Sequence, residues 1–411
     1  MNLEYFIAKR LISAKQHKSS ISAPIIKIAI IAIAIGVVMM LVSFATGLGL
    51  QQKIREKMSA FNGHVTISSY DNNNSQISEN PIPLEQDFYP EFTSVEGVEH
   101  IQATAYKAGV IRTPKDFEGI IVKGVGADFN WRLFEDFLVE GEMPDYTAEL
   151  HDEILISEYI ANRLGFKVGD KVITYFLKNE TNPSTLLRAF VVKGIYNSGF
   201  RDFDELYLLA DIRHIQRLNK WDSTQVGNFE VFLEDFDELE EKGQEIYENT
   251  GSFLDTQTIK QKYYSIFEWL SLFDFNIALI IGIMILVAGI NMITALLVLI
   301  LERTQMIGIL KAIGANDWSV RKIFLYNAAY LIILGLFWGN LIGLGLLYAQ
   351  KYFKLLPLNP ETYYVTEAPV YIGWEYILAV NIGTLVLCML MLLVPSYIIT
   401  KISPVKAMKF D

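Results

Sequence analysis

The sequence predicts an α-helical membrane protein with four transmembrane helices and an α+β extracytoplasmic domain inserted between the first and second helices. Three observations predict this fold class: four long runs without charge, one large polar segment, and a charge difference between that segment and the short loops. Each run exceeds the about 20 helical residues that cross a hydrocarbon core of about 30 Å. The four runs are 28–52, 276–301, 323–350 and 376–400.

Basic residues gather in the short segments outside the spans. Residues 1–27, 302–322 and 401–411 together carry 12 basic and 4 acidic residues, whereas segment 53–274 carries 21 basic and 39 acidic residues. Short basic segments stay on the cytoplasmic side of a membrane. We therefore expect both termini and the loop 302–322 in the cytoplasm, and the large acidic domain on the opposite side.

The first span is predicted to continue beyond the membrane as a stalk. The segment after Leu50, QQKIREKMSAF, consists of good helix formers without Gly or Pro before Gly63. A single helix over 28–61 would be about 50 Å long at 1.5 Å per residue. A similar helix-forming segment precedes the second span. Two helical stalks would therefore join the spans rigidly to the domain.

These boundaries give a complete division of the chain. Residues 1–24 place apolar side chains on one helical face and are predicted to lie on the membrane surface, with a disordered basic leader as the alternative. The predicted parts are the arm 1–24, the first span with its stalk 25–61, the domain 62–255, the second stalk and span 256–301, the cytoplasmic helix 302–322, the third span 323–350, the loop 351–375, the fourth span 376–400 and the tail 401–411.

The inserted domain has the pattern of short strands mixed with helices. Short β-branched runs bounded by Gly, Pro, Asn or Asp predict strands. These runs are HVTISSY, GVIRT, GIIVKGV, EILIS, KVITYF and AFVVKGIY, and the predicted helices are 157–164, 209–218 and 234–248. In the third span, Gly335, Gly339 and Gly343 recur every four residues. Such a strip predicts close packing of another helix, although glycines are common in membrane helices generally.

Several classes of function have no support in the sequence. Cys388 is the single cysteine, so no disulfide can form within the chain. The sequence contains no phosphate-binding G-x-x-x-x-G-K-[ST] motif, and its five histidines lack the spacing of metal ligands. No basic stripe with interleaved aromatics suggests nucleic acid. We therefore expect a non-catalytic subunit with no metal and no cofactor on this chain.

The cytoplasmic loop reads ERTQMIGILKAIGANDWSVR from Glu302 to Arg321. Met306, Ile309, Leu310 and Ile313 share one helical face, Gly314 is suited to end this helix, and Asn316 or Asp317 to begin the next. From this periodicity, two interpretations stay open. The helix either seats in a groove of a partner protein or lies at the membrane surface without one.

This loop resembles the coupling segment of the FtsX/MacB superfamily of ABC-transporter permeases. Those permeases have an acidic and a basic residue followed by an apolar I-L-K-A-x-G-A run, which Glu302, Arg303, Ile309, Leu310, Lys311, Ala312, Gly314 and Ala315 match. Met306 departs from the pattern, because relatives often have an acid there. ISEYIANRLGFKVGDKV, ATGLGLQQKIREKM and the tail ISPVKAMK resemble further family signatures.

The resemblance implies a MacB-like periplasmic core domain and a multi-pass protein of the bacterial inner membrane. It implies a cytoplasmic ABC ATPase dimer as partner, with ATP and Mg bound there rather than on this chain, and a second permease copy or a paralogue. The residues implied to couple to the ATPase are Glu302, Arg303, Met306, Gly308, Ile309, Leu310, Lys311 and Gly314.

Within the superfamily, the segment with Tyr364, Pro369 and Val370 resembles the lipoprotein-releasing (Lol-type) permeases. This branch implies ATP-driven extraction of lipoproteins from the inner membrane by mechanotransmission, and their transfer to a periplasmic carrier. The hairpin 175–190 would dock the carrier through Phe176, Asn182, Pro183 and Leu187, unless it is an ordinary hairpin. Position near the outer leaflet suggests substrate contacts at Met40, Val42, Phe44, Leu48, Phe267, Leu270 and Phe273.

Two other branches give alternative functions. A MacB-like permease would export drugs or peptides, and it usually carries a fused ATPase or a larger outer domain. An FtsX-like subunit transports nothing and activates a cell-wall hydrolase, and its outer domain is typically much smaller than segment 53–274. The length of that segment favours the lipoprotein-releasing branch.

Overall fold

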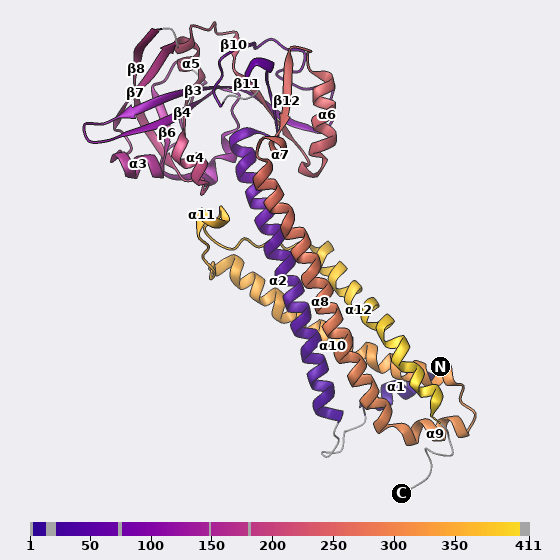
Figure 1. The fold of residues 1–411 in the computed structure, drawn as a ribbon. Helices are drawn as coiled ribbons and strands as arrows, with labels where there is room; N and C mark the ends of the chain where they lie inside the picture. The colour runs from indigo at the N-terminus through magenta and orange to yellow at the C-terminus, as the bar shows by residue number, and fades with distance from the viewer. Residues whose placement is uncertain (1–2, 14–21, 73–75, 148, 180–181, 403–411) are drawn as a thin grey trace. The chain divides into compact units, whose positions relative to one another are not determined.

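The computed structural model describes residues 3–13, 22–72, 76–147, 149–179 and 182–402 (Figure 1). The chain forms two compact units. The helical unit comprises residues 1–51, 269–357 and 367–411, and the sheet unit comprises 52–268 and 358–366. The segment 358–366, which lies between the third and fourth spans in sequence, thus belongs to the sheet unit.

Four long helices dominate the helical unit. Each contains an apolar stretch long enough to cross a membrane, and this confirms the four predicted spans. Their apolar side chains recur all around each helix, as expected for helices that lipid and protein surround together. The helices are α2 Ser22–Asn62, α8 Tyr264–Glu302, α10 Asp317–Phe353 and α12 Trp374–Ser396, with the shorter α1 Leu3–Ser13, α9 Thr304–Ala312 and η5 Tyr397–Lys401.

The strip of glycines on α10 faces α2. A Cβ atom built on Gly335 would lie 2.7 Å from Ile33 Cγ2, and one on Gly339 would lie 2.6 Å from Val37 Cβ. At Gly343 the corresponding distance, to Leu41 Cδ1, is 3.1 Å. The two backbones therefore approach so closely that only hydrogen fits between them at the first two positions. Close packing of this kind holds helices together where lipid removes the hydrophobic driving force.

The sheet unit contains a ten-stranded mixed sheet, in which β7 pairs with both β3 and β8, and a separate two-stranded pair. The order along the large sheet is β12-β1-β11-β3-β4-β9-β6-β8-β5. Its strands are β1 Val65–Ser69, β3 Val98–Arg112, β4 Phe117–Val125, β5 Leu138–Gly141, β6 Glu153–Ser157, β7 Lys171–Asn179, β8 Asn182–Tyr196, β9 Tyr207–Asp211, β11 Asn228–Leu233 and β12 Leu254–Thr258; the pair is β2 Ile82–Pro83 and β10 Gln225–Val226.

Helices α3 to α7 and α11 complete the sheet unit (Figure 1). Side-chain oxygens begin several of them, as in α3, where Ser157 accepts a hydrogen bond from Ile160 N, and α5, where Asp211 accepts one from Arg213 N. The helices are α3 Glu158–Leu164, α4 Arg201–Leu206, α5 Ile212–Asn219, α6 Leu239–Asn249, α7 Ile259–Lys262 and α11 Pro360–Tyr363.

All six predicted strands lie in the sheet, but two predicted helices were wrong at their starts. The predicted helix 234–248 is α6 only from Leu239, after a short 3-10 helix, and the predicted helix 209–218 also begins later. Residues 209–211 belong to β9, and α5 begins only at Ile212. All five residues of β9 are buried between β4 and β6. A strand covered on both faces shows a continuous apolar run, which periodicity does not distinguish from a buried helix. Strand β11, also buried throughout, was not predicted, and its apolar run is interrupted by Glu230.

Candidate functional site

The predicted coupling helix is present as α9, between α8 and α10 (Figure 1). Gly314 follows it with a φ of +98°, and Ala315 N–H donates to the Leu310 carbonyl at 2.9 Å. Glycine adopts this left-handed conformation without steric cost, so the chain reverses here. The Asn316 side chain then accepts a hydrogen bond from Trp318 N at 3.1 Å and begins α10.

The predicted coupling residues do not all lie on the exposed face of α9. Ile307 and Gly308 are buried in the helical unit, and Met306 and Leu310 are half-buried against its core. Ile309 and Ile313 are 49% and 76% exposed. The apolar surface that α9 offers to another protein is therefore centred on these two isoleucines. Gly308 faces inward, so a substitution there would disturb packing before it disturbed any partner.

Lys311 binds the segment that follows the fourth span. Its ammonium donates to the carbonyls of Ile399 at 2.7 Å and of Ile402 at 3.1 Å, and it pairs with the Asp317 carboxylate at 2.8 Å. The side chain of Lys311 is only 9% exposed. A cation stabilises the terminal carbonyls of a helix, here those of η5 after α12. Lys311 thus fastens α9 to the end of the fourth span.

The predicted substrate residues lie in different environments. Met40 and Leu270 are buried among neighbouring helices, so they offer no surface to a substrate. Val42, Phe44, Leu48 and Phe273 are half-buried, with Phe44 packed on Tyr376 at a ring distance of 5.5 Å. Phe267 belongs to the sheet unit, where it stacks on Phe236.

Within the helical unit, α2 and α8 are joined by a polar contact. Gln51 Nε2 donates to the Asp274 carboxylate at 2.8 Å and to the Leu270 carbonyl at 3.3 Å. The sequence prediction did not include this contact, because each residue alone is an unremarkable flanking polar group. Next to it, Tyr371 N–H donates to the Ala45 carbonyl at 2.9 Å. The segment before α12 therefore rests on α2.

The last turn of α2 ends in the core of the sheet unit. Lys123 from β4 donates to the Phe61 carbonyl and to both Glu230 carboxylate oxygens, the latter at 2.8 and 2.9 Å. The Lys123 and Glu230 side chains are 0% and 1% exposed. Tyr106 OH adds a hydrogen bond to Glu230 at 2.6 Å. A fully paired buried charge of this kind fixes the geometry of the groups around it.

Aromatic rings and a second lysine extend this anchor. The Phe61 ring packs on Phe134 and Phe203, each at 4.7 Å between ring centroids. The Asn62 side-chain oxygen accepts hydrogen bonds from Lys262 Nζ at 3.0 Å and from Tyr263 OH at 2.9 Å, just before α8 begins. The end of α2 and the start of α8 are thus held by one network, which we call the helix anchor: Phe61, Asn62, Tyr106, Lys123, Glu230, Lys262 and Tyr263.

Sequence reasoning missed the helix anchor, although a signal was present. Lys123 interrupts the apolar strand GIIVKGV, and Glu230 interrupts NFEVF. A lone charge inside a strand that is otherwise apolar requires a buried partner.

Tyr364 lies in the segment 358–366, between α10 and α12, and packs against other residues of the sheet unit. It has a positive φ of 59°, its ring stacks on Phe200 at 4.5 Å, and its carbonyl accepts a hydrogen bond from Lys57 at 3.2 Å. Lys57 lies on the last turns of α2, so this segment too is bound to the helix near the anchor. Pro369 and Val370 belong to the helical unit instead.

The hairpin β7–β8 shows which of the predicted docking residues are accessible. Phe176 is fully buried, and a Cβ on Gly109 would lie 2.8 Å from its ring, so Phe176 does not reach a partner. Leu187 is 51% exposed and lies opposite Tyr175, on the same face as the 68% exposed Leu177. Asn182 and Pro183 begin β8, where Asn182 is in register with Asn179.

Comparison with known families decides the class of the protein. Residues 28–246 match the MacB-like periplasmic core domain, more than half of the chain, and residues 278–404 match the FtsX-like permease C-terminal family. The chain belongs to the FtsX-like permeases with a MacB-like periplasmic core domain. This confirms the predicted family and fold class.

Relatives resemble the permease over its whole length. The lipoprotein-releasing system transmembrane protein LolC of Xylella fastidiosa (strain 9a5c) is 20% identical, with 100% of this chain and 99% of LolC covered. LolE of Haemophilus influenzae is 22% identical, with 99% of each chain covered. The extracellular domain of the transporter YknZ, a solved structure, matches 40% of this chain and 83% of its own at 15% identity and a TM-score of 0.30.

The described residues of the permease hold no group of three or more His, Cys, Asp or Glu side chains arranged to bind a metal ion.

Proposed function

We propose that this permease is the membrane subunit of an ABC transporter that extracts lipoproteins from the bacterial inner membrane and passes them to a periplasmic carrier. The observation that carries the proposal is the helix anchor, because it holds the ends of two membrane-crossing helices in one buried network. Helix α2 is unbroken over 41 residues, from the apolar stretch to the anchor. The whole-length similarity to LolC and LolE supports the lipoprotein as substrate.

In this proposal a cytoplasmic ATPase dimer, which binds ATP and Mg, grips the exposed surface of α9. A groove of the ATPase would receive Ile309 and Ile313, the two exposed isoleucines. Movement of α9 reaches the fourth span through Lys311, which holds the carbonyls after α12. The adjoining helix α8, and α2, which Gln51 joins to α8 through Asp274, carry the movement to the helix anchor.

The substrate would enter the membrane region between paired permeases, as either two copies or this chain and a paralogue. The half-buried side chains of Val42, Phe44 and Leu48 are apolar and suited to acyl chains. Both termini and α9 would face the cytoplasm and the sheet unit the periplasm, following the basic short segments. A carrier would bind the exposed Leu177 and Leu187 on the β7–β8 hairpin.

Substitution of both exposed isoleucines tests the contact with the ATPase. Ile309→Asp with Ile313→Asp should abolish co-purification of an ATPase, because each carboxylate would be buried without a partner in the groove. Phe253→Asp is the matched control, since Phe253 is 87% exposed in the sheet unit. Undiminished co-purification of the double variant would show that α9 does not dock through this surface.

Depletion of the permease tests the substrate. Outer-membrane lipoproteins should accumulate in the inner membrane when the permease is removed, as measured by fractionation and mass spectrometry of both membranes. Unchanged lipoprotein sorting would refute the substrate assignment. Pull-down with the full-length permease would then separate the alternatives, since an export duct and a cell-wall hydrolase are different partners from a lipoprotein carrier.

A further inference from the structure

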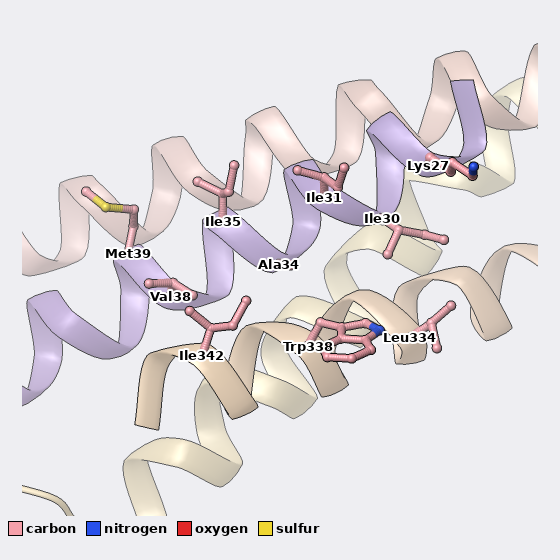
Figure 2. Close-up of a pocket in the computed structure, with 10 residues that line it drawn as sticks. All are labelled: Lys27, Ile30, Ile31, Ala34, Ile35, Val38, Met39, Leu334, Trp338 and Ile342. Carbon is pink, nitrogen blue, oxygen red and sulfur yellow. The ribbon is translucent and has the colours of Figure 1, made fainter. Parts of the chain in front are cut away.

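The helical unit has an open apolar groove between α2 and α10 (Figure 2). Its volume is about 560 Å³, which lies in the range of roughly 300–1,000 Å³ typical of small-molecule sites. Ile31, Ile35 and Met39 line it from α2, and Trp338 and Ile342 line it from α10. These five side chains are 45–57% exposed, so the groove opens toward the surroundings of the helices.

The length of the groove matches one leaflet of a bilayer. It extends along α2 from Lys27 to Met39, which is about 18 Å at 1.5 Å per residue. Half of a hydrocarbon core is about 15 Å thick. Lys27 is the last charged residue before the apolar run 28–52, so this end of the groove lies where the membrane surface begins.

Among the residues that the structure describes, Lys27 is the single charged one that lines the groove, and Figure 2 shows it at one end. The structure records no ion pair between Lys27 and any other residue that it describes, and the side chain is exposed. The remaining lining is apolar apart from the indole N–H of Trp338. An apolar groove with one cation at its rim is complementary to an amphiphile with an anionic head and a single chain in the groove.

We propose that this groove binds an anionic phospholipid of the leaflet at the basic ends of the spans. The lipid phosphate pairs with the Lys27 ammonium, and one acyl chain lies along Ile31 and Ile35 against Trp338. A helix of a second copy fits the site poorly, because such a helix would cross both leaflets whereas the groove spans only one. The site requires only that α2 and α10 cross the membrane, so it does not depend on the lipoprotein as substrate.

The bound chain would support a close contact between two helices of this unit. Next to the groove, Gly335 and Gly339 bring α10 against Ile33 and Val37 of α2. An acyl chain in the groove fills the remaining space along the same pair of helices. The half-buried Val42, Phe44 and Leu48 lie further along α2 than Met39, so the phospholipid and the proposed lipoprotein contacts occupy different halves of the helix.

Native mass spectrometry of the full-length permease tests the site. The permease is released from nanodiscs that contain equal amounts of phosphatidylglycerol and phosphatidylcholine. We expect at least a fivefold preference for retained phosphatidylglycerol in the wild type and no preference in Lys27→Gln. Ile35→Trp, which fills the groove from its open side, should lower the retention of both lipids severalfold.

Two controls match these variants. Lys351→Gln removes an exposed cation near the other end of α10, and Leu279→Trp enlarges an exposed side chain on α8 outside the groove. Both should keep the wild-type preference. Equal retention of the two lipids by the wild type, or an unchanged preference in Lys27→Gln, would overturn the proposal. So would efficient cross-linking between two permeases through Ile35→Cys, because a second copy would then occupy the groove.

Discussion

At the scale of single residues, the stability of the sheet unit depends on Lys123, the buried lysine of the helix anchor. Burial lowers the pKa of Lys123, while the adjacent Glu230 carboxylate opposes that shift. The ion pair persists in the core because every oxygen of Glu230 is hydrogen-bonded, by Lys123, Tyr106 and Gln102. Removing one member leaves the other charge without its counterion, and this costs more than the pair contributes.

Lys123→Met should therefore lower the free energy of unfolding by about 3–5 kcal/mol. Chemical denaturation of the full-length permease in detergent, followed by aromatic circular dichroism, measures this loss. Lys53→Met is the control, because Lys53 pairs with Glu56 on the surface and both side chains are about half exposed. Such a surface pair contributes at most about 1 kcal/mol. Equal effects of the two variants would contradict a structural role for the buried pair.

A second residue, His64, makes the stability of the sheet unit depend on pH. His64 Nδ1 accepts a hydrogen bond from Leu233 N–H at 2.7 Å, and burial lowers the pKa of His64 to about 4 from an ordinary 6.5. The folded state thus favours neutral His64, so its contribution is complete above about pH 6.5 and is lost as the pH falls toward 4. Asp204 acts in the opposite direction, since burial raises its pKa to about 6.

His64→Asn separates the two groups, because the Asn oxygen can accept from Leu233 N–H without titrating. The wild type should lose more thermal stability than His64→Asn between pH 7 and pH 5. Differential scanning fluorimetry of the full-length permease at both pH values gives this difference. Parallel changes in Tm for the two proteins would show that His64 does not titrate in this window.

At the scale of elements, the sequence predicted what composition determines and missed what tertiary packing determines. The four spans follow from long runs without charge, because a bilayer imposes helix length directly. The end of α9 and the start of α10 followed from Gly314 and Asn316, which act locally. The inward position of Gly308 depends on packing within the helical unit, and the engagement of Lys311 depends on contacts with η5, almost 90 residues away in sequence. No local pattern contains that information.

The glycine strip of α10 allows close packing against α2, and its contribution to stability can be measured. Gly339→Ala should destabilise the helical unit by about 1–3 kcal/mol, because the new Cβ would meet Val37 and force α2 and α10 apart. Gly345→Ala on the same helix is the control, since nothing lies within 4 Å of its Cβ position. Thermal unfolding in detergent compares the two. A neutral Gly339→Ala variant would mean that the helices are not packed as closely as described.

At the scale of the whole molecule, the proposed mechanism requires α2 to act as one rigid element. The helix contains residues of both compact units and ends in a buried charge network. A hinge within it would absorb a movement that a rigid helix transmits. The requirement concerns helix continuity alone, so a substitution that interrupts α2 at an exposed position tests it without removing any buried contact.

Gln52→Pro is such a substitution. Gln52 is exposed and its side chain donates a hydrogen bond to Glu56 of the same helix, whereas proline removes a main-chain hydrogen bond and kinks the helix, at a cost of about 3 kcal/mol. We expect the variant to insert in the membrane and bind the proposed ATPase normally, and to lose at least tenfold in lipoprotein release from proteoliposomes. Gln52→Ala keeps the helix and should keep release. Full release by Gln52→Pro would exclude α2 as the transmitting element, and loss of ATPase binding would indicate a fault in assembly rather than in transmission.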